Sequence, residues 1–202
     1  MLSPIEDIIY GGYKKKKGIV SFDEMKVIAS KVEKRHPSVL MVTSIPAGKS
    51  VAMIAAEMAA ALALQGKKVL LVEGDRKKPS LHEWFYMERP ADMNQEPLTT
   101  VLPTFLPGLD ILLANGSNKK PIDIWLSPSF KQHVASWQET YDRVIFSAPS
   151  LSSGVETELL AEGCQEAVLV IQRKKDKFEE IRKAQAKLER AGCQVIGAVY
   201  QK

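Results

Sequence analysis

The sequence feature that most restricts the fold is the apolar stretch Val39 to Val42, which leads through a short turn into Gly48-Lys49-Ser50. A run rich in alanine, methionine and leucine then continues to Gln65. The unbroken apolar stretch predicts a strand buried on both faces, and the run after the turn predicts a helix. A strand, a turn carrying Gly-Lys-Ser and a helix are the layout of a phosphate-binding loop, whose backbone N–H groups face an anion.

This candidate loop departs from the full pattern Gly-x4-Gly-Lys-[Ser/Thr]. Thr43 stands where the first glycine would be, and a β-branched residue disfavours the backbone angles of such a turn. Pro46 has no N–H to contribute to a phosphate cradle. The residues alone therefore leave two readings open, phosphate binding and a plain strand–helix turn. The candidate cofactor-binding residues are Ser44, Ala47, Gly48, Lys49 and Ser50.

Composition narrows the range of partners. The chain has 202 residues, 45% of them hydrophobic and 26% charged, which is typical of one soluble domain with a sizeable core. A net charge of +4 is too small to predict nucleic-acid binding, and no aromatic residues interleave with the lysine clusters as stacking platforms. We therefore expect no nucleic-acid partner. The run Lys14 to Lys17 favours a solvated face or a contact with an anionic membrane surface.

The sequence also restricts the compartment. No apolar stretch is as long as a membrane span requires, and the lysines follow Ile8-Ile9-Tyr10 instead of preceding an apolar core, so no signal peptide is predicted. Cys164 and Cys193 lie in apolar surroundings and indicate a reducing compartment. We expect a cytoplasmic protein, at most peripheral to the inner face of the cell membrane.

Predicted strands and helices alternate along the chain. We expect a flexible basic arm over residues 1–18 and a single domain over 19–202. Further strands are predicted at 69–72, 109–113, 144–147, 167–172 and 195–200. Helices are predicted from Phe22 to just before His36-Pro37, at 80–86, at 122–141 with a break near Pro128, at 156–162 and at 177–191. Residues 88–107 are predicted to be a long loop. This alternation predicts an α/β fold with a mostly parallel central sheet and helices on both faces.

Several stretches, in order, resemble the cytoplasmic kinase domain of the bacterial tyrosine kinases that regulate capsule and exopolysaccharide synthesis. This family is a branch of the MinD/ParA-like P-loop ATPases. The matching stretches are residues 42–50, 69–82, 109–116, 141–145, 156–161 and 191–200. The resemblance implies a Rossmann-like P-loop NTPase fold that uses ATP and Mg²⁺. It also implies autophosphorylation on a C-terminal tyrosine cluster and a transmembrane polysaccharide co-polymerase or adaptor as partner.

The positions that the resemblance assigns to chemistry are altered. The family loop Thr-Ser-x-x-Pro-Gly-Glu-Gly-Lys-Ser is two residues longer than residues 43–50 here, so the loop cannot wrap a β-phosphate in the same way unless the strand gives up residues. The family motif Asp-x-Asp-x-Arg-x-Pro is represented by residues 73–79, with Glu73 at the expected general base and Lys77 in place of arginine. The strand that normally ends in a metal-binding Asp ends here in Ser147, which brings no charge to Mg²⁺.

The resemblance therefore implies Glu73 and Asp75 as degenerate catalytic residues, and Ser50, Asp75 and Ser147 as doubtful magnesium ligands. Three hypotheses follow. The first is a non-catalytic relative that has a regulatory or scaffolding role in polysaccharide synthesis. Its nucleotide binding would be weak or lost, and its partner would be an adaptor or an intact kinase homologue. The second is a working ATP-dependent tyrosine autokinase, and the third is a MinD/ParA-like ATPase. The family's oligomerisation motif Glu-x-x-Arg-x-x-Arg is missing at Glu24, so no oligomeric state is predicted.

Overall fold

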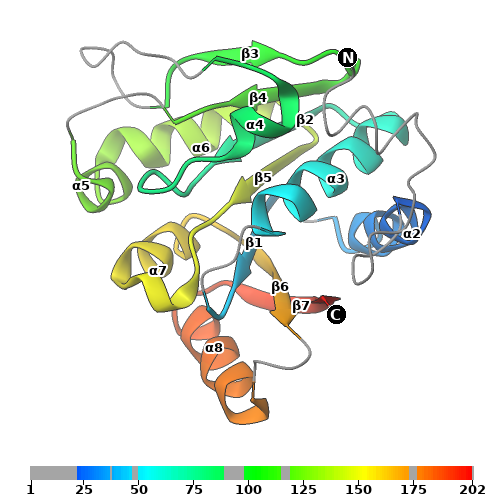
Figure 1. Ribbon diagram of the computed structural model, residues 1–202. Coiled ribbons are helices and arrows are strands. Elements are labelled where there is room, and N and C mark those ends of the chain that lie inside the picture. The colour runs from blue at the N-terminus through cyan, green and yellow to red at the C-terminus, as the bar shows by residue number, and fades with distance from the viewer. Residues whose placement is uncertain are drawn as a thin grey trace.

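The computed structural model describes residues 22–36, 38–46, 50–88, 98–114, 119–172 and 177–201 (Figure 1). The strands are β1 (Val39–Ser44), β2 (Val69–Glu73), β3 (Val101–Pro103), β4 (Leu109–Leu112), β5 (Arg143–Ser147), β6 (Glu166–Gln172) and β7 (Gln194–Gln201). The α-helices are α2 (Phe22–Glu33), α3 (Ser50–Leu64), α4 (Leu81–Phe85), α5 (Pro121–Trp125), α6 (Pro128–Thr140), α7 (Val155–Ala161) and α8 (Phe178–Arg190), and η1 (Leu151–Ser153) is a 3₁₀ turn. In these ranges no helix combines the length and the apolar character needed to cross a membrane.

All seven strands belong to one sheet in the order β3-β4-β2-β5-β1-β6-β7 (Figure 1). Every pairing is parallel except that of β3, which runs antiparallel to β4 at the edge. The central strands β1, β2 and β5 are buried at every position, as their unbroken apolar sequences predict. The α/β architecture predicted from the sequence is confirmed.

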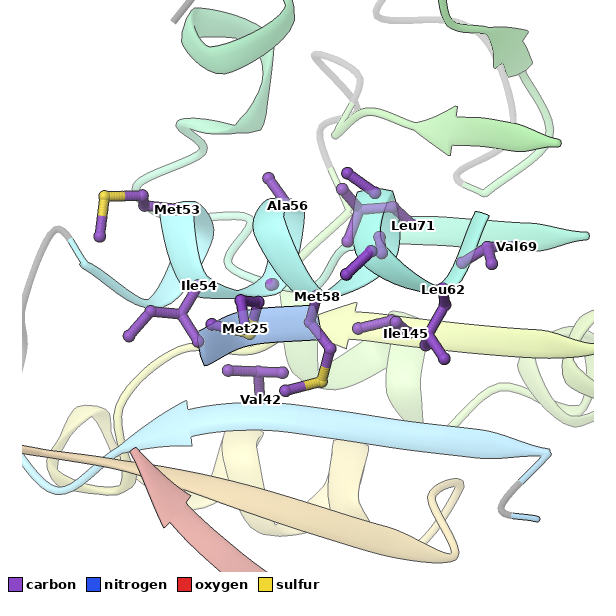
Figure 2. Close-up of a cluster of buried hydrophobic side chains, with 14 of the residues drawn as sticks. Met25, Val42, Met53, Ile54, Ala56, Met58, Leu62, Val69, Leu71 and Ile145 are labelled. Carbon is purple, nitrogen blue, oxygen red and sulfur yellow. The ribbon is translucent and has the colours of Figure 1, made fainter. Parts of the chain in front are cut away.

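Two hydrophobic cores lie on opposite faces of the sheet. On one face, α2, α3 and α4 pack against the strands, and Figure 2 shows Met25 of α2 and Met58 of α3 near Val42 and Ile145 of the sheet. On the other face, α5, α6, α7 and α8 form the second core. Helix α3 is apolar on all sides because it is covered by α2 as well as by the sheet. Helices therefore cover both faces, as expected.

The structure corrects three boundaries. Residues 101–103 form strand β3 inside the predicted loop 88–107, where a short edge strand ending in Pro103 gives little periodic signal. The first strand extends two residues beyond the predicted Val42, to Ser44. Pro121 begins helix α5 instead of ending a turn, because proline suits the first helical position. The predicted basic arm, with Lys14 to Lys17, lies outside the described residues.

One carboxyl group is buried in the first core. Glu57, in the middle of α3, is 1% exposed, and its Oε2 accepts no hydrogen bond from the part of the chain that the structure describes. Burial raises the pKa of Glu57 to about 8. The folded protein therefore holds a proton on Glu57 at pH values where an unfolded chain has released it.

We predict that the free energy of unfolding falls as pH rises from about 4.5 to about 8. Over this range the folded state binds the Glu57 proton more tightly than the unfolded state, and the loss is complete above the folded pKa. The Glu57→Gln variant should lose the part of this slope that Glu57 contributes, and should be more stable than the wild type at pH 8.5 by an amount on the order of 4 kcal/mol. Urea unfolding at pH 5.5 and 8.5 measures both.

The matched control is Glu83→Gln, which makes the same change on the exposed side of α4. This variant should keep the wild-type dependence on pH. The prediction is wrong if Glu57→Gln and the wild type lose the same stability between the two pH values.

Candidate functional site

The predicted site residues lie where the central parallel strands end. Residue Ser147 at the end of β5 pairs with Val42 of β1 on one side and with Glu73 of β2 on the other. The carboxyl ends of neighbouring parallel strands form the rim at which open α/β sheets bind ligands. The structure thus brings the end of β1, Glu73 and Ser147 together at one rim.

Thr43 and Ser44, which a longer phosphate-binding loop would need, remain part of strand β1. Thr43 pairs with Leu169, and Ser44 pairs with Val170 of β6. The buried Thr43 hydroxyl donates to the carbonyl of Pro149 (2.6 Å), and the Ser44 hydroxyl donates to the carbonyl of Pro46 (2.7 Å). The strand therefore gives no residues to the loop.

The rest of the predicted phosphate cradle is only partly described. Ala47, Gly48 and Lys49 lie outside the described residues, and Ser50 is the first residue of α3. The connection between β1 and α3 is thus limited to residues 45–49. On its near side the carbonyl of Ile45 accepts a hydrogen bond from the N–H of Ser152 in η1 (3.1 Å). This bond ties the start of the loop to the turn that follows β5.

The carboxylate of Glu73 is directed at backbone N–H groups. Its Oε1 accepts hydrogen bonds from the N–H of Ser80 (2.5 Å) and of Leu81 (2.7 Å), and its Oε2 accepts one from the N–H of Ala114 (2.8 Å). The side chain is 1% exposed. Burial raises the pKa of Glu73, while the three N–H groups act in the opposite direction. Glu73 thereby fixes the start of α4 and the segment that follows β4.

Asp75 shapes the turn after β2. Its Oδ1 accepts hydrogen bonds from the N–H groups of Lys77 (3.2 Å) and Lys78 (3.0 Å), as an Asp that initiates a turn commonly does. The N–H groups of Gly74 and Asp75 both donate to the carbonyl of Ser147 (2.9 and 3.1 Å). The ammonium group of Lys77 pairs with Glu156 at the start of α7 (2.9 Å). The turn is thereby held against β5 and α7.

Ser147 faces this turn through its backbone. Ser147 is 4% exposed, and its carbonyl oxygen accepts hydrogen bonds from the N–H groups of Gly74 and Asp75. A serine hydroxyl is uncharged, so Ser147 supplies no negative charge at the rim. A metal-binding role would therefore rest on other residues, since hard divalent cations prefer carboxylate oxygens.

Sequence reasoning missed two features of the rim. Gly74 is required by close packing, because an added Cβ would lie 2.8 Å from Leu160 and 3.0 Å from the Ser147 carbonyl oxygen. A glycine directly after a buried strand could have signalled this close approach. The second feature is the Thr157 hydroxyl, which donates to the carbonyl of Ser150 (3.0 Å). No sequence pattern distinguishes this threonine from others on short helices.

Comparison with known proteins identifies relatives that match most of the chain. No protein-family model matches the chain. The tyrosine-protein kinase YwqD of Bacillus subtilis is 28% identical over 171 residues, which are 82% of this chain and 72% of the kinase. The tyrosine-protein kinase CpsD of Streptococcus agalactiae is 22% identical over 179 residues, 83% of this chain and 76% of that protein.

Solved structures share the fold. The chimerical protein CapA2B2 superposes with a TM-score of 0.82 at 22% identity, covering 98% of this chain and 91% of the chimera. MinD of Pyrococcus horikoshii, solved with Mg-ADP, gives a TM-score of 0.66 at 18% identity, covering 80% of this chain and 69% of MinD. The fold is therefore the Rossmann-like P-loop NTPase fold. By sequence, the chain is a homologue of the bacterial tyrosine-protein kinases.

Proposed function

We propose that this chain is a tyrosine-kinase-like P-loop protein that acts as a regulatory or scaffolding subunit in exopolysaccharide or capsule synthesis, with weak or lost nucleotide binding. Its partner would be a transmembrane polysaccharide co-polymerase or adaptor, or an intact kinase homologue. Its place would be the cytoplasm, at the inner face of the cell membrane. The sequence similarity to tyrosine-protein kinases supports a role in exopolysaccharide or capsule synthesis. The side-chain arrangement at the rim of the sheet supports weak or lost nucleotide binding.

The observation that carries this proposal is the position of the Glu73 carboxylate. A general base must present a lone pair to the proton that it removes, within about 2.6–3.2 Å. Both Glu73 oxygens instead accept backbone N–H groups, at 2.5–2.8 Å. Turning the carboxylate toward a substrate would leave the buried N–H groups of Leu81 and Ala114, and the partly buried one of Ser80, without an acceptor. Each unsatisfied group costs roughly 1–3 kcal/mol, so the structural role opposes the catalytic one.

The other altered positions act in the same direction. Phosphoryl transfer depends on positioning and on charge that neutralises the developing transition state. Ser147 contributes no charge, and an oxygen of Asp75 already holds the turn after β2. The pairing of β1 with β6 up to Ser44 limits the loop to residues 45–49. The described residues therefore fit a magnesium-bound triphosphate poorly, although ADP or ATP analogues with magnesium occupy structural relatives such as MinD and a cobyrinic acid a,c-diamide synthase.

An active enzyme is the second candidate. Ser50 begins a long helix directly after the loop, as a phosphate-binding Gly-Lys-Ser requires, and Asp75 is retained. These features favour either an ATP-dependent tyrosine autokinase or a MinD/ParA-like ATPase. All of these alternatives require bound nucleotide, so a nucleotide-binding measurement separates them from the main proposal.

We predict that Mg·ATP does not stabilise the protein. A ligand that bound with a Kd of about 10 μM would stabilise the fold by about 2.7 kcal/mol at about 1 mM. This corresponds to about 5–10 °C in Tm for a domain of this size. We expect a shift below about 1 °C in differential scanning fluorimetry, and no phosphotyrosine after incubation with Mg·ATP.

A large shift together with phosphotyrosine would identify an active kinase and contradict the proposal. A large shift with ATP hydrolysis but without phosphotyrosine would favour the MinD/ParA-like alternative. The double variant Glu73→Asp with Ser147→Asp restores both aspartates of the family pattern, of which only Ser147→Asp adds a charge. If it gains magnesium-dependent ATP binding, these two side chains cause the defect. If it does not, the short loop does.

We also predict that Glu73→Asp lowers stability, although it restores the residue type of the family motif. The shorter side chain cannot reach the N–H groups of α4 and of Ala114 together, so buried donors lose their acceptor. We expect a loss of about 2–3 kcal/mol in the free energy of unfolding, measured in urea.

The control is Glu83→Asp, the same change at an exposed position of α4, where surface substitutions usually alter stability by less than about 0.5 kcal/mol. Equal stability of Glu73→Asp and Glu83→Asp would show that the buried carboxylate does not hold the rim together.

A further inference from the structure

Strand β7 ends the sheet and leaves one backbone edge open. It pairs with β6 along Gln194–Gln201, and the described residues place no strand on its other side. Figure 1 shows β7 at the margin of the sheet, beyond β6. Gly197 and Ala198 in its centre are exposed, and a Cβ added at Gly197 would meet no atom within 4 Å. The edge is therefore accessible along its middle.

This edge lacks most of the features that usually prevent strand pairing. Natural proteins protect open edges with lysine, proline, β-bulges or very short strands, and β7 carries only a single β-bulge among these. The opposite edge follows this rule, because β3 has three residues and ends in Pro103. Strand β7 has eight residues, Gln-Val-Ile-Gly-Ala-Val-Tyr-Gln, without a charge or a proline. An edge of this length and composition is suited to pair with another strand.

The β-bulge in β7 fixes which side chains share a face. Between Ala167 and Val168 of β6 the register shifts by one residue, so Ile196 is the extra residue. Residues paired in register share a face of the sheet. Val195, Ala198 and Tyr200 therefore lie on the face of α8, and their β6 partners all belong to the second core. Ile196, Gly197 and Val199 lie on the opposite face.

With this pattern the edge is complementary to itself. An antiparallel copy related by a two-fold axis through Ala198 places Ala198 beside Ala198 of the other copy. Val199 then lies opposite the bulge at Ile196 and Gly197, and Tyr200 opposite Val195. Each pairing joins side chains on the same face, as antiparallel strands require. Because the strand carries no charge, two copies meet without repulsion of like charges.

We propose that β7 is a homodimerisation edge, on which a second copy of this chain adds its own β7 antiparallel across a two-fold axis at Ala198. The two sheets join into one continuous sheet, and the unpaired N–H and C=O groups of both edges become hydrogen-bonded. The contact is about 26 Å long for eight residues at about 3.3 Å each. This inference does not depend on whether the protein binds nucleotide.

The test is the oligomeric state of the 202-residue chain in solution. Sedimentation equilibrium from about 5 to 200 μM covers the range in which a dimer of modest interface size dissociates. We expect a reversible monomer–dimer equilibrium in the wild type. Ala198→Lys places two ammonium groups at the axis, where opposite Cβ atoms are about 5 Å apart, and should weaken the dimer at least about tenfold. The control, Ala135→Lys, makes the same change on the exposed side of α6 and should dimerise like the wild type.

A charge-swap mixture tests the register. Ala198→Lys and Ala198→Glu should each be monomeric alone and should form a heterodimer when mixed, because opposite charges then meet at the axis. Circular dichroism checks that both variants fold, as the exposure of Ala198 leads us to expect. A wild type that stays monomeric throughout the range, open-ended oligomers, or dimers that tolerate Ala198→Lys would overturn the proposal. Failure of the mixture to dimerise would also overturn it.

Discussion

The pairing of strand β1 with its neighbours is the constraint on which the rest of the site depends. β1 pairs in parallel with β5 up to Val42 and with β6 up to Ser44. Releasing Thr43 and Ser44 into the loop would break these pairings and expose polar backbone groups at the sheet. The length of the connection to α3 is therefore fixed by the sheet. A phosphate-binding loop needs backbone N–H groups that surround an anion, and a fixed, short connection containing Pro46 supplies fewer of them.

The two buried glutamates of this domain differ in how well their carboxyl groups are hydrogen-bonded. Glu73 is surrounded by three N–H donors, so its charge is compensated by hydrogen bonds that also fix α4. Glu57 has an oxygen without a partner among the described residues, and burial raises its pKa to about 8. Burying the neutral Glu57 carboxyl costs little folding free energy compared with what the apolar residues of α3 contribute. Burying the ionised carboxylate would cost much more. The ionisation of Glu57 therefore makes the free energy of unfolding fall as pH rises, and the raised pKa of Glu73 acts in the same direction.

The sequence was sufficient for the sheet but not for the site. Buried parallel strands have unbroken apolar sequences, so β1, β2, β5 and β6 were predictable from residue type alone. β3 was not, because its three residues are stabilised by pairing with β4 and not by their own pattern. The strand order, which the sequence did not predict, places Glu73 beside Ser147 at the rim. The direction of the Glu73 side chain was not predictable either, since Ser80, Leu81 and Ala114 reach it only through the tertiary fold, and N–H donors leave no trace in the sequence.

The altered residues of the rim share a physical consequence, which is that they connect elements instead of leaving groups available for a ligand. Lys77 pairs with Glu156 of α7, and Ser147 accepts two N–H groups through its carbonyl. Catalytic sites usually keep charged groups poised and incompletely satisfied, at a cost in stability. In the non-catalytic role that we propose, such groups would instead be satisfied within the domain and would stabilise it. The edge of β7 would then present a fixed surface to a second copy, as the proposed dimer requires.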